Sequence, residues 1–515
     1  MSKKLLESKN MTSGQKIKKN LLIGTIGQLI ALVFGILLPK LVIVSYGSEV
    51  NGLLSSVTNI YAYVALVEAG VAAASCQALY KPITENNRER MNAILAATNQ
   101  YYHRTGYIYL ALIVAFSVVY PLLIHTDIPL FIVVLVILFN GLGNVINYFF
   151  HGKYLILLKA DGKNYVRTGL ELVTNTLKQA IKIVFIKLGY SVIFVQFAAM
   201  LVSFLQMAYI TYYIKKHYPW IDFSVLPDKQ SISQSKNVVV HEINYMITSN
   251  VDTVLLTAFE TLKTVSVYSL YNLLFSTINR LLRVVRDSLE FKIAHLFHED
   301  REKFQIAFSV FEVYYITLAF AVFSVANYFV LPFVSLYTRD VSDAVYVIPI
   351  LPVLFVLINL LSAGRYPSEA MIHIAGHFKQ TQNSAAIETI INVVISIILV
   401  QFVGIAGVLL GTIISSLYRT VYLIDYVNKN IVGRRSKDTW LCWSINLFLF
   451  LITLVVNRMI VVDLDSYVSI FMFCIPYGFC TIILYVGVVS LLMRHGMDVL
   501  WRMGKLWNER RIHRK

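Results

Sequence analysis

The chain has 515 residues, of which 57% are hydrophobic and 14% charged, and its mean hydropathy is +0.65. A soluble chain of this length would fold as about two to four domains, and this composition excludes them. Apolar stretches of about 18 to 25 residues recur along the whole sequence, and each can cross a hydrocarbon core of about 30 Å as a helix. We therefore predict an all-α polytopic membrane protein.

The predicted elements begin, in chain order, with a basic tail over 1–19 that leads into the first apolar stretch. That stretch is too long for the apolar region of a signal peptide, so we expect a retained first helix. About fourteen transmembrane spans follow, and a second basic tail covers 493–515. The spans are predicted near 20–44, 51–75, 105–125, 128–150, 166–187, 191–214, 237–258, 265–292, 306–330, 343–363, 384–402, 404–427, 440–460 and 467–492.

The net charge of +16 is distributed by side of the membrane. Most of the 45 Lys and Arg residues fall in the two tails and in the even-numbered loops between the predicted spans. Since short basic segments are retained on the cytoplasmic side, both chain ends are assigned to the cytoplasm. Topology and attraction to anionic membrane lipids thus account for the basicity, and we prefer this interpretation to nucleic-acid binding.

Two halves of the sequence show a weak internal repeat. A shift of 215 residues pairs Gly189 with Gly404, and each glycine lies in a very short turn between two apolar spans. The same shift brings spans one to six over spans seven to twelve. We predict two six-helix lobes, 20–214 and 237–427, joined by a cytoplasmic linker over 215–236 and followed by two further helices within 440–492.

Several local features accompany this plan of six, six and two helices. They are the polar start of span one at Asn20–Gln28, the Tyr46-Gly47 turn before Asn51, the Glu68-Ala-Gly70 segment, and the Ala160-Asp-Gly-Lys163 loop. With them the chain resembles the polysaccharide-biosynthesis flippases, the Wzx-type exporters in the MATE-like (MOP) superfamily. The resemblance covers essentially the whole chain and rests more on architecture than on any motif.

The resemblance implies a flippase of the bacterial cytoplasmic (inner) membrane. Its substrate would be an undecaprenyl-pyrophosphate-linked oligosaccharide, moved from the cytoplasmic to the outer leaflet for surface-polysaccharide synthesis beside a polysaccharide polymerase. A MATE-type drug or metabolite exporter is the first alternative, although such exporters lack the last two helices. The lipid II flippase is the next, but it would be expected to carry several arginines in its first spans, where this chain has only Lys40. We expect a monomer.

Charged residues inside the spans are the candidates for mechanism, because an ionisable group at membrane depth is costly and usually faces a cavity or a partner. Lys178 and Lys182 lie four residues apart in span five, so they project from one helical face and could hold a pyrophosphate. The alternatives are that both side chains extend toward an interface, or that Lys178 pairs with Glu171.

Span eight ends in an arginine run, with Arg280, Arg283 and Arg286 spaced by three and sharing roughly one face. The internal shift places Arg283 opposite Glu68 of span two. The resemblance implies that spans one, two, seven and eight line the cleft between the lobes. We therefore predict an anionic headgroup site at the arginines and an inner gate between Glu68 and Arg283, with an ordinary basic helix end as the alternative.

Span seven carries Glu242 and Asp252 in an unusually polar sequence, which predicts a helix face that lines a hydrated cavity. These two carboxylates are our candidates for coupling to H⁺ or Na⁺, with simple pairing to Arg280 or Lys182 as the alternative. We expect no cofactor, no metal site and no enzymatic activity. The sequence has no P-loop motif, and the loops are too short for the acceptor domain of a membrane glycosyltransferase.

Overall fold

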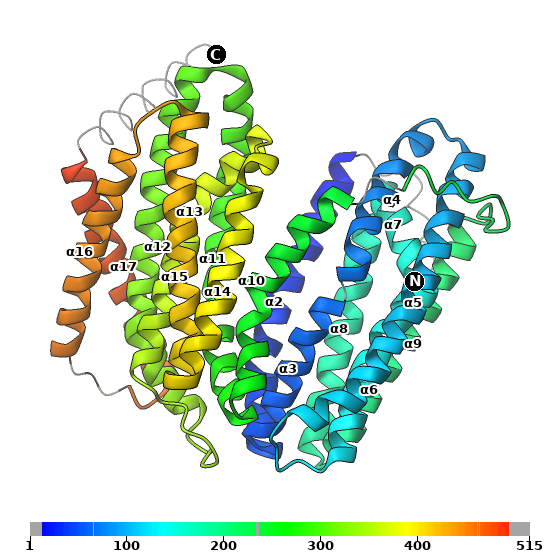
Figure 1. Ribbon diagram of the computed structural model, residues 1–515, viewed down its shortest axis with the longest axis horizontal. Helices are drawn as coiled ribbons and strands as arrows, with labels where there is room; N and C mark the ends of the chain where they lie inside the picture. The colour runs from blue at the N-terminus through cyan, green and yellow to red at the C-terminus, as the bar shows by residue number, and fades with distance from the viewer. Residues whose placement is uncertain (1–12, 65, 233–235, 461, 463, 494–515) are drawn as a thin grey trace. The chain divides into compact units, whose positions relative to one another are not determined.

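The computed structural model describes residues 13–493 except 65, 233–235, 461 and 463. Within its helices, the side chains at 13–26, 64–70 and 236–245, and a few others, lie outside the described residues. Throughout that part of the chain the regular structure is helical, as Figure 1 shows. The predicted all-α polytopic fold is confirmed.

The helices form two compact units that divide between Ser266 and Val267. The N-terminal unit contains α2 (Ser13–Tyr46), α3 (Ser48–Val64), α4 (Leu66–Thr84), α5 (Arg88–Leu123), α6 (Leu130–Ile146), the π-helical turn η2 (Asn147–His151), α7 (Gly152–Ala160), α8 (Asn164–Lys187), α9 (Val192–His217) and α10 (Lys236–Phe259). The division follows α10 because this helix packs on α3 and α4. The six-helix lobes remain a prediction, since these units divide elsewhere.

The C-terminal unit begins within α11 (Leu262–Glu299), which starts just before the division. It continues through α12 (Arg301–Tyr337), α13 (Ile350–Ala375), α14 (Phe378–Val403), α15 (Ile405–Val427), the π-helical turn η4 (Asn428–Val432), α16 (Lys437–Met459) and α17 (Tyr467–Leu492). Helix α13 starts later than the predicted span near 343–363. Pro349 stands at its N-cap, and proline suits the start of a helix because its missing N–H leaves no bond unmade there.

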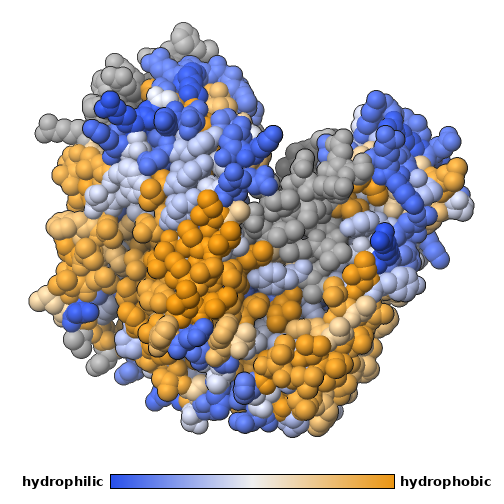
Figure 2. Space-filling model, in the orientation of Figure 1, coloured by the Kyte–Doolittle hydropathy of each residue, from blue (hydrophilic) through white to orange (hydrophobic). Residues whose placement is uncertain are grey.

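Nine helices of the described part of the chain are long and apolar enough to cross a membrane, namely α5, α6 with part of η2, α9, α12, α13, α14, α15 with η4, α16 and α17. Their outer faces carry large apolar side chains, such as Met472 and Ile475 on α17. Figure 2 shows apolar residues gathered along the bodies of the helices and hydrophilic residues toward their ends. Helices α8 and α11 are also long enough to cross a membrane, but they are not among the nine because polar and charged residues interrupt their apolar sequence.

The pairing of α14 with α15 depends on small residues. Gly404, at φ +56°, makes the turn between them, and the other predicted turn glycine, Gly189 between α8 and α9, has φ +78°. A Cβ atom on Gly407 would lie 2.3 Å from the carbonyl oxygen of Leu399. Only glycine lets the two backbones approach this closely, as in membrane helix pairs built on small residues.

Part of the predicted linker is docked on the N-terminal unit. The side chain of Asn92 on α5 donates to the carbonyl of Trp220 at 3.1 Å and accepts from the N–H of Asp222 at 3.2 Å. The N–H of Asp228 donates to the carbonyl of Ala93 at 3.0 Å. These bonds tie the segment after α9 to the first turns of α5.

Candidate functional site

Helix α8 presents one polar face along most of its length. The helix starts after the turn at Gly162, which has φ +67°, and ends before Gly189. Thr168, Glu171 and Asn175 recur at intervals of three and four residues, so their side chains lie on the same side of the helix. Few side chains of α8 are fully buried, which leaves this face available to a ligand.

A cavity of about 520 Å³ lies between this face and α2. Its volume falls within the range of about 300–1,000 Å³ that is usual for small-molecule sites. Its walls combine amide, hydroxyl and carboxylate groups with aliphatic and aromatic side chains. The lining residues are Gly27, Gln28, Ile30, Ala31, Phe34 and Gly35 from α2, and Thr168, Glu171, Leu172, Asn175, Thr176 and Gln179 from α8.

The polar groups of the cavity are only partly satisfied by the protein. Glu171 accepts from Arg167 at 2.8 Å, and the hydroxyl of Thr168 donates to the carbonyl of Asn164 at 2.9 Å. The amide oxygen of Gln179 is buried and accepts no hydrogen bond within the described structure. A buried acceptor without a donor costs about 1–3 kcal/mol, so the cavity favours a ligand that carries N–H or O–H groups.

The structure places Lys178 and Lys182 on the same side of α8 as the cavity. Lys178 follows Glu171 by seven residues and Lys182 follows Asn175 by seven, which is about two helical turns in each case. Both lysines are half-buried. In the part of the chain that is described, Glu171 pairs with Arg167 rather than with Lys178, and no carboxylate lies within 4.0 Å of either ammonium group.

The arginines of α11 divide into two kinds. Arg280 and Arg283 are exposed. Arg286 is half-buried, pairs with Asp287 at 2.9 Å and stacks over the ring of Tyr366, 4.0 Å from its centroid. Arg286 is thus held within the C-terminal unit. The roles predicted for the three residues remain predictions.

Of the predicted coupling and gate residues, only Asp252 and Arg283 have described side chains. Asp252 on α10 is buried and lies near enough to Tyr63 of α3 to interact electrostatically. Tyr63 donates to the carbonyl of Ile247 at 3.2 Å. The Asp252 side chain therefore lies in the packing of α10 against its neighbours. The side chains of Glu68 and Glu242 are outside the described residues.

No family model matches the chain, and no curated protein sequence matches it. Solved structures do. A structure of the lipid II flippase MurJ in an inward closed conformation superimposes with a TM-score of 0.70 at 14% identity, covering 91% of this chain and 99% of that one. The two chains share one fold. An inward-facing MATE family multidrug transporter of the MOP superfamily has a TM-score of 0.59 at 13% identity, covering 76% and 93% of the two chains.

A third structure, that of the MATE multidrug transporter DinF-BH, gives a TM-score of 0.57 at 13% identity and covers 80% of this chain and 95% of that one. The fold and the apolar helices together identify a multi-pass membrane protein. The structural likeness agrees with the MATE-like fold predicted from the sequence and does not separate the Wzx-type flippases from other proteins of this fold.

The C-terminal unit contains a buried charge network that the sequence analysis did not predict. Arg365 on α13 pairs with Glu388 on α14 at 2.6 Å and with Glu369 at 2.9 Å. Arg419 on α15 approaches the other oxygen of Glu388 at 3.6 Å. Two signals were present in the sequence, the spacing of Arg365 and Glu369 by four residues and the single acid Glu388 in an apolar span. Neither predicts the pairings with Glu388, because these cross between helices.

A second buried pair joins α12 to the start of α16 and the turn before it. Glu312 accepts from Arg434, which follows η4, and from the hydroxyl of Thr439 on α16 at 2.8 Å. In both clusters every charged side chain is paired with an opposite charge, so we assign both clusters a structural role in helix packing. Among the described residues, no group of three or more His, Cys, Asp and Glu side chains could hold a metal ion.

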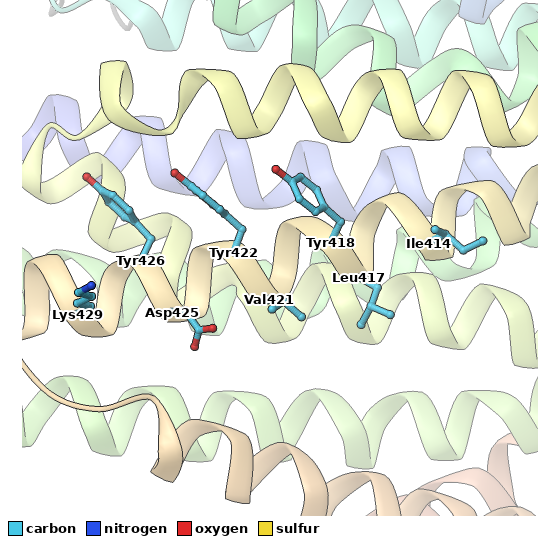
Figure 3. A pocket seen from close by; sticks show the side chains of 8 residues that line it. All are labelled: Ile414, Leu417, Tyr418, Val421, Tyr422, Asp425, Tyr426 and Lys429. Carbon is cyan, nitrogen blue, oxygen red and sulfur yellow. The ribbon is translucent and has the colours of Figure 1, made fainter.

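A groove of about 660 Å³ runs along one face of α15 in the C-terminal unit (Figure 3). The rings of Tyr418, Tyr422 and Tyr426 stack along it, with centroids 6.4 and 5.9 Å apart. Lys429 lies beyond Tyr426 at the end of the row, and Asp425 points away from the rings (Figure 3). Tyrosine is enriched where a membrane meets water, so this row fits an aromatic belt at the predicted cytoplasmic end of α15.

Proposed function

We propose that this protein is a flippase that moves an undecaprenyl-pyrophosphate-linked oligosaccharide from the cytoplasmic to the outer leaflet of a bacterial cytoplasmic membrane. Alternating access would expose the site to each side of the membrane in turn, and the transported unit would be used in surface-polysaccharide synthesis. The observation that carries the proposal is the half-buried pair Lys178 and Lys182, which continues the polar cavity face of α8 and has no carboxylate within 4.0 Å in the described structure.

A cation in a membrane-spanning segment is expensive unless a counter-charge accompanies it. A pyrophosphate supplies negative charge at two linked phosphates, which matches two ammonium groups one helical turn apart. Lysine attracts phosphate as a flexible point charge, without the rigid two-pronged geometry of arginine. Such a site can hold the headgroup during the transition and still release it.

The alternatives differ in how much of the chain they explain. The multidrug transporter structures cover 76% and 80% of this chain, whereas the lipid II flippase structure covers 91%. The larger share of the chain that the flippase structure covers favours a flippase of lipid-linked substrates over a drug exporter. Lipid II shares the undecaprenyl pyrophosphate group, so the choice of an oligosaccharide substrate rests on the sequence resemblance.

The remaining predicted residues take subsidiary roles in this proposal. Arg280, Arg283 and Arg286 would attract the headgroup at the predicted cytoplasmic end of α11, and Glu68 with Arg283 would form the inner gate. Asp252 and Glu242 are the candidates for coupling to H⁺ or Na⁺. Membrane lipids surround the protein, and a polysaccharide polymerase would take the product in the outer leaflet.

Transport in proteoliposomes tests the proposal directly. The probe is the lipid-linked oligosaccharide fraction extracted from the host, and the readout is its appearance in the opposite leaflet. Loss of a charge-assisted hydrogen bond of about 1.5–3 kcal/mol predicts that Lys182→Gln slows transport about 10-fold or more. Lys187→Gln changes an exposed lysine of the same helix and should transport normally.

Deletion of the gene gives the second test. Loss of a surface glycan, with its lipid-linked unit accumulating on the cytoplasmic side, would support the flippase. Drug sensitivity with an intact surface glycan would instead identify an exporter. Equal transport by wild type and by the Lys178→Gln, Lys182→Gln double variant would refute the role of the lysine pair.

A further inference from the structure

The cavity between α2 and α8 contains chemistry that a pyrophosphate does not use. Its lining is neutral apart from Glu171, which is already paired with Arg167 at 2.8 Å. The amide and hydroxyl groups of the lining can donate to an anion, but the amide oxygens and the carboxylate only accept, and an anion gains nothing from them. The cavity therefore calls for a second part of the ligand, adjacent to the charged group and different from it.

We infer that this cavity is a glycan subsite, which binds the first sugar ring or rings next to the pyrophosphate through Gln179 and Asn175. The inference rests on the proposed flippase function and adds the residues that bind and recognise the sugar. Its strongest support is the amide oxygen of Gln179, which is buried and accepts no hydrogen bond from any described residue. A sugar hydroxyl is a donor of the kind that this oxygen lacks.

The neighbouring groups are suited to the same ligand. Asn175 lies one helical turn before Gln179 and is exposed to the cavity, so its amide can both donate and accept. Thr176 adds a hydroxyl. On the opposite wall, Phe34 of α2 offers an aromatic surface, and Leu172 adds an aliphatic one. A sugar ring presents hydroxyls at its edge and C–H groups on its faces, and this mixed lining complements both.

The amides lie beside the lysines along α8, as the sugar lies beside the pyrophosphate in the substrate: Gln179 stands between Lys178 and Lys182, and Asn175 precedes Lys178 by three residues. Lys182 follows Gln179 by three residues, a rise of about 4.5 Å along the helix. A phosphate held by Lys182 would place the sugar attached to it beside the amides one turn away. One helix would thus contact the charged group and the sugar side by side, because the lysines and the amides share one face.

Binding measurements on the full-length protein in lipid nanodiscs test this inference with two probes. One is the polyprenyl-pyrophosphate oligosaccharide fraction of the host, and the other is undecaprenyl pyrophosphate without sugar. Gln179→Met keeps the length of the side chain and removes its hydrogen bonds. We expect it to weaken binding of the glycan-bearing probe about 5- to 100-fold and to leave binding of the sugar-free probe unchanged.

The matched control is Gln206→Met, which makes the same change at a half-buried residue of α9 that does not line the cavity. Asn175→Leu is a second variant at an exposed position, where misfolding is not expected, and it should show the same selective loss. Size-exclusion profiles check that each variant is folded.

The outcomes separate the two proposals. If wild-type protein binds neither probe, the flippase function fails and the glycan subsite fails with it. If the wild type binds both probes equally well, or if Gln179→Met and Asn175→Leu weaken both probes to the same extent, the pyrophosphate site stands and the glycan subsite is overturned. A loss confined to the glycan-bearing probe supports the inference.

Discussion

The close packing of α14 against α15 gives a prediction whose size follows from the structure. In Gly407→Ala, the new Cβ atom would lie 2.3 Å from the carbonyl oxygen of Leu399, 2.4 Å from its carbonyl carbon and 2.7 Å from the nitrogen of Val400. Real Cβ atoms essentially never come within 3.0 Å of such atoms. All three are backbone atoms, so no side-chain rotation can relieve the contact, and the two helices must separate.

Separation also strains the hydrogen bonds that cross this interface. The side chain of Asn392 donates to the hydroxyl of Thr412 at 2.9 Å and to that of Ser415 at 3.3 Å, and Ser396 donates to the carbonyl of Val408 at 3.2 Å. Overpacking of this kind costs about 1–3 kcal/mol. At about 2–4 °C per kcal/mol for a unit of this size, we expect the melting temperature to fall by about 2–12 °C.

Thermal unfolding of the detergent-purified protein, followed by tryptophan fluorescence, measures this change. The matched control is Gly487→Ala on α17, where an added Cβ meets no atom within 4 Å. Alanine is the better helix former, so the control should melt at or slightly above the wild-type temperature. If Gly407→Ala melts with the wild type, the helices are not held at this distance in the membrane protein and the reasoning is wrong.

Two further predictions concern charges. Glu388→Ala leaves Arg365 and Arg419 without their shared carboxylate while their side chains are only 11% and 12% exposed, so it should destabilise the protein by about 3–5 kcal/mol in the same assay. Glu369→Ala removes a carboxylate that is 33% exposed and should cost less. Equal melting temperatures of the two variants would contradict this prediction. Asp300 caps α12, and its hydrogen bonds with Lys303 lower the pKa of the Asp300 carboxyl group. The charged cap therefore stabilises the folded state fully at any pH above the ordinary pKa of a carboxyl group, and this stabilisation is lost as the pH falls through the lowered pKa. Asp300→Ala should therefore lower the melting temperature at pH 7 and lose this effect as the pH falls through the lowered pKa of Asp300, and a deficit that persists in stronger acid would argue against the cap.

Much of the fold follows from local sequence properties. Apolar length alone locates the helices α9, α14, α15 and α17 within a few residues, because a span must satisfy its backbone bonds internally. The short turns at Gly189 and Gly404 are equally local, since both need a positive φ. The start of α13 was placed too early because the apolar residues before Pro349 extend the hydropathy signal beyond the helix.

The site was less accessible to sequence reasoning. Charge within a predicted span singled out Lys178 and Lys182 as candidates, since the cost of a cation at membrane depth is visible in one segment. Gln179 and Asn175 gave no such signal, because neutral amides are common in helices, and only the position of α2 shows that they line a cavity. The network of Arg365, Glu388 and Arg419 joins three helices, and pairings of that kind depend on the tertiary fold.

The hairpin of α14 and α15 also bears on how the protein is made. Glu388, Asn392 and Ser396 follow one another by four residues along a single side of α14, and all three are buried. If α14 entered the lipid alone, that row of carboxylate, amide and hydroxyl groups would lie in hydrocarbon without partners, at a cost of several kcal/mol. The turn at Gly404 is too short to delay the arrival of α15. The two helices should therefore leave the translocon together as one insertion unit, with the polar side chains of α14 already hydrogen-bonded to α15 before the pair enters the lipid.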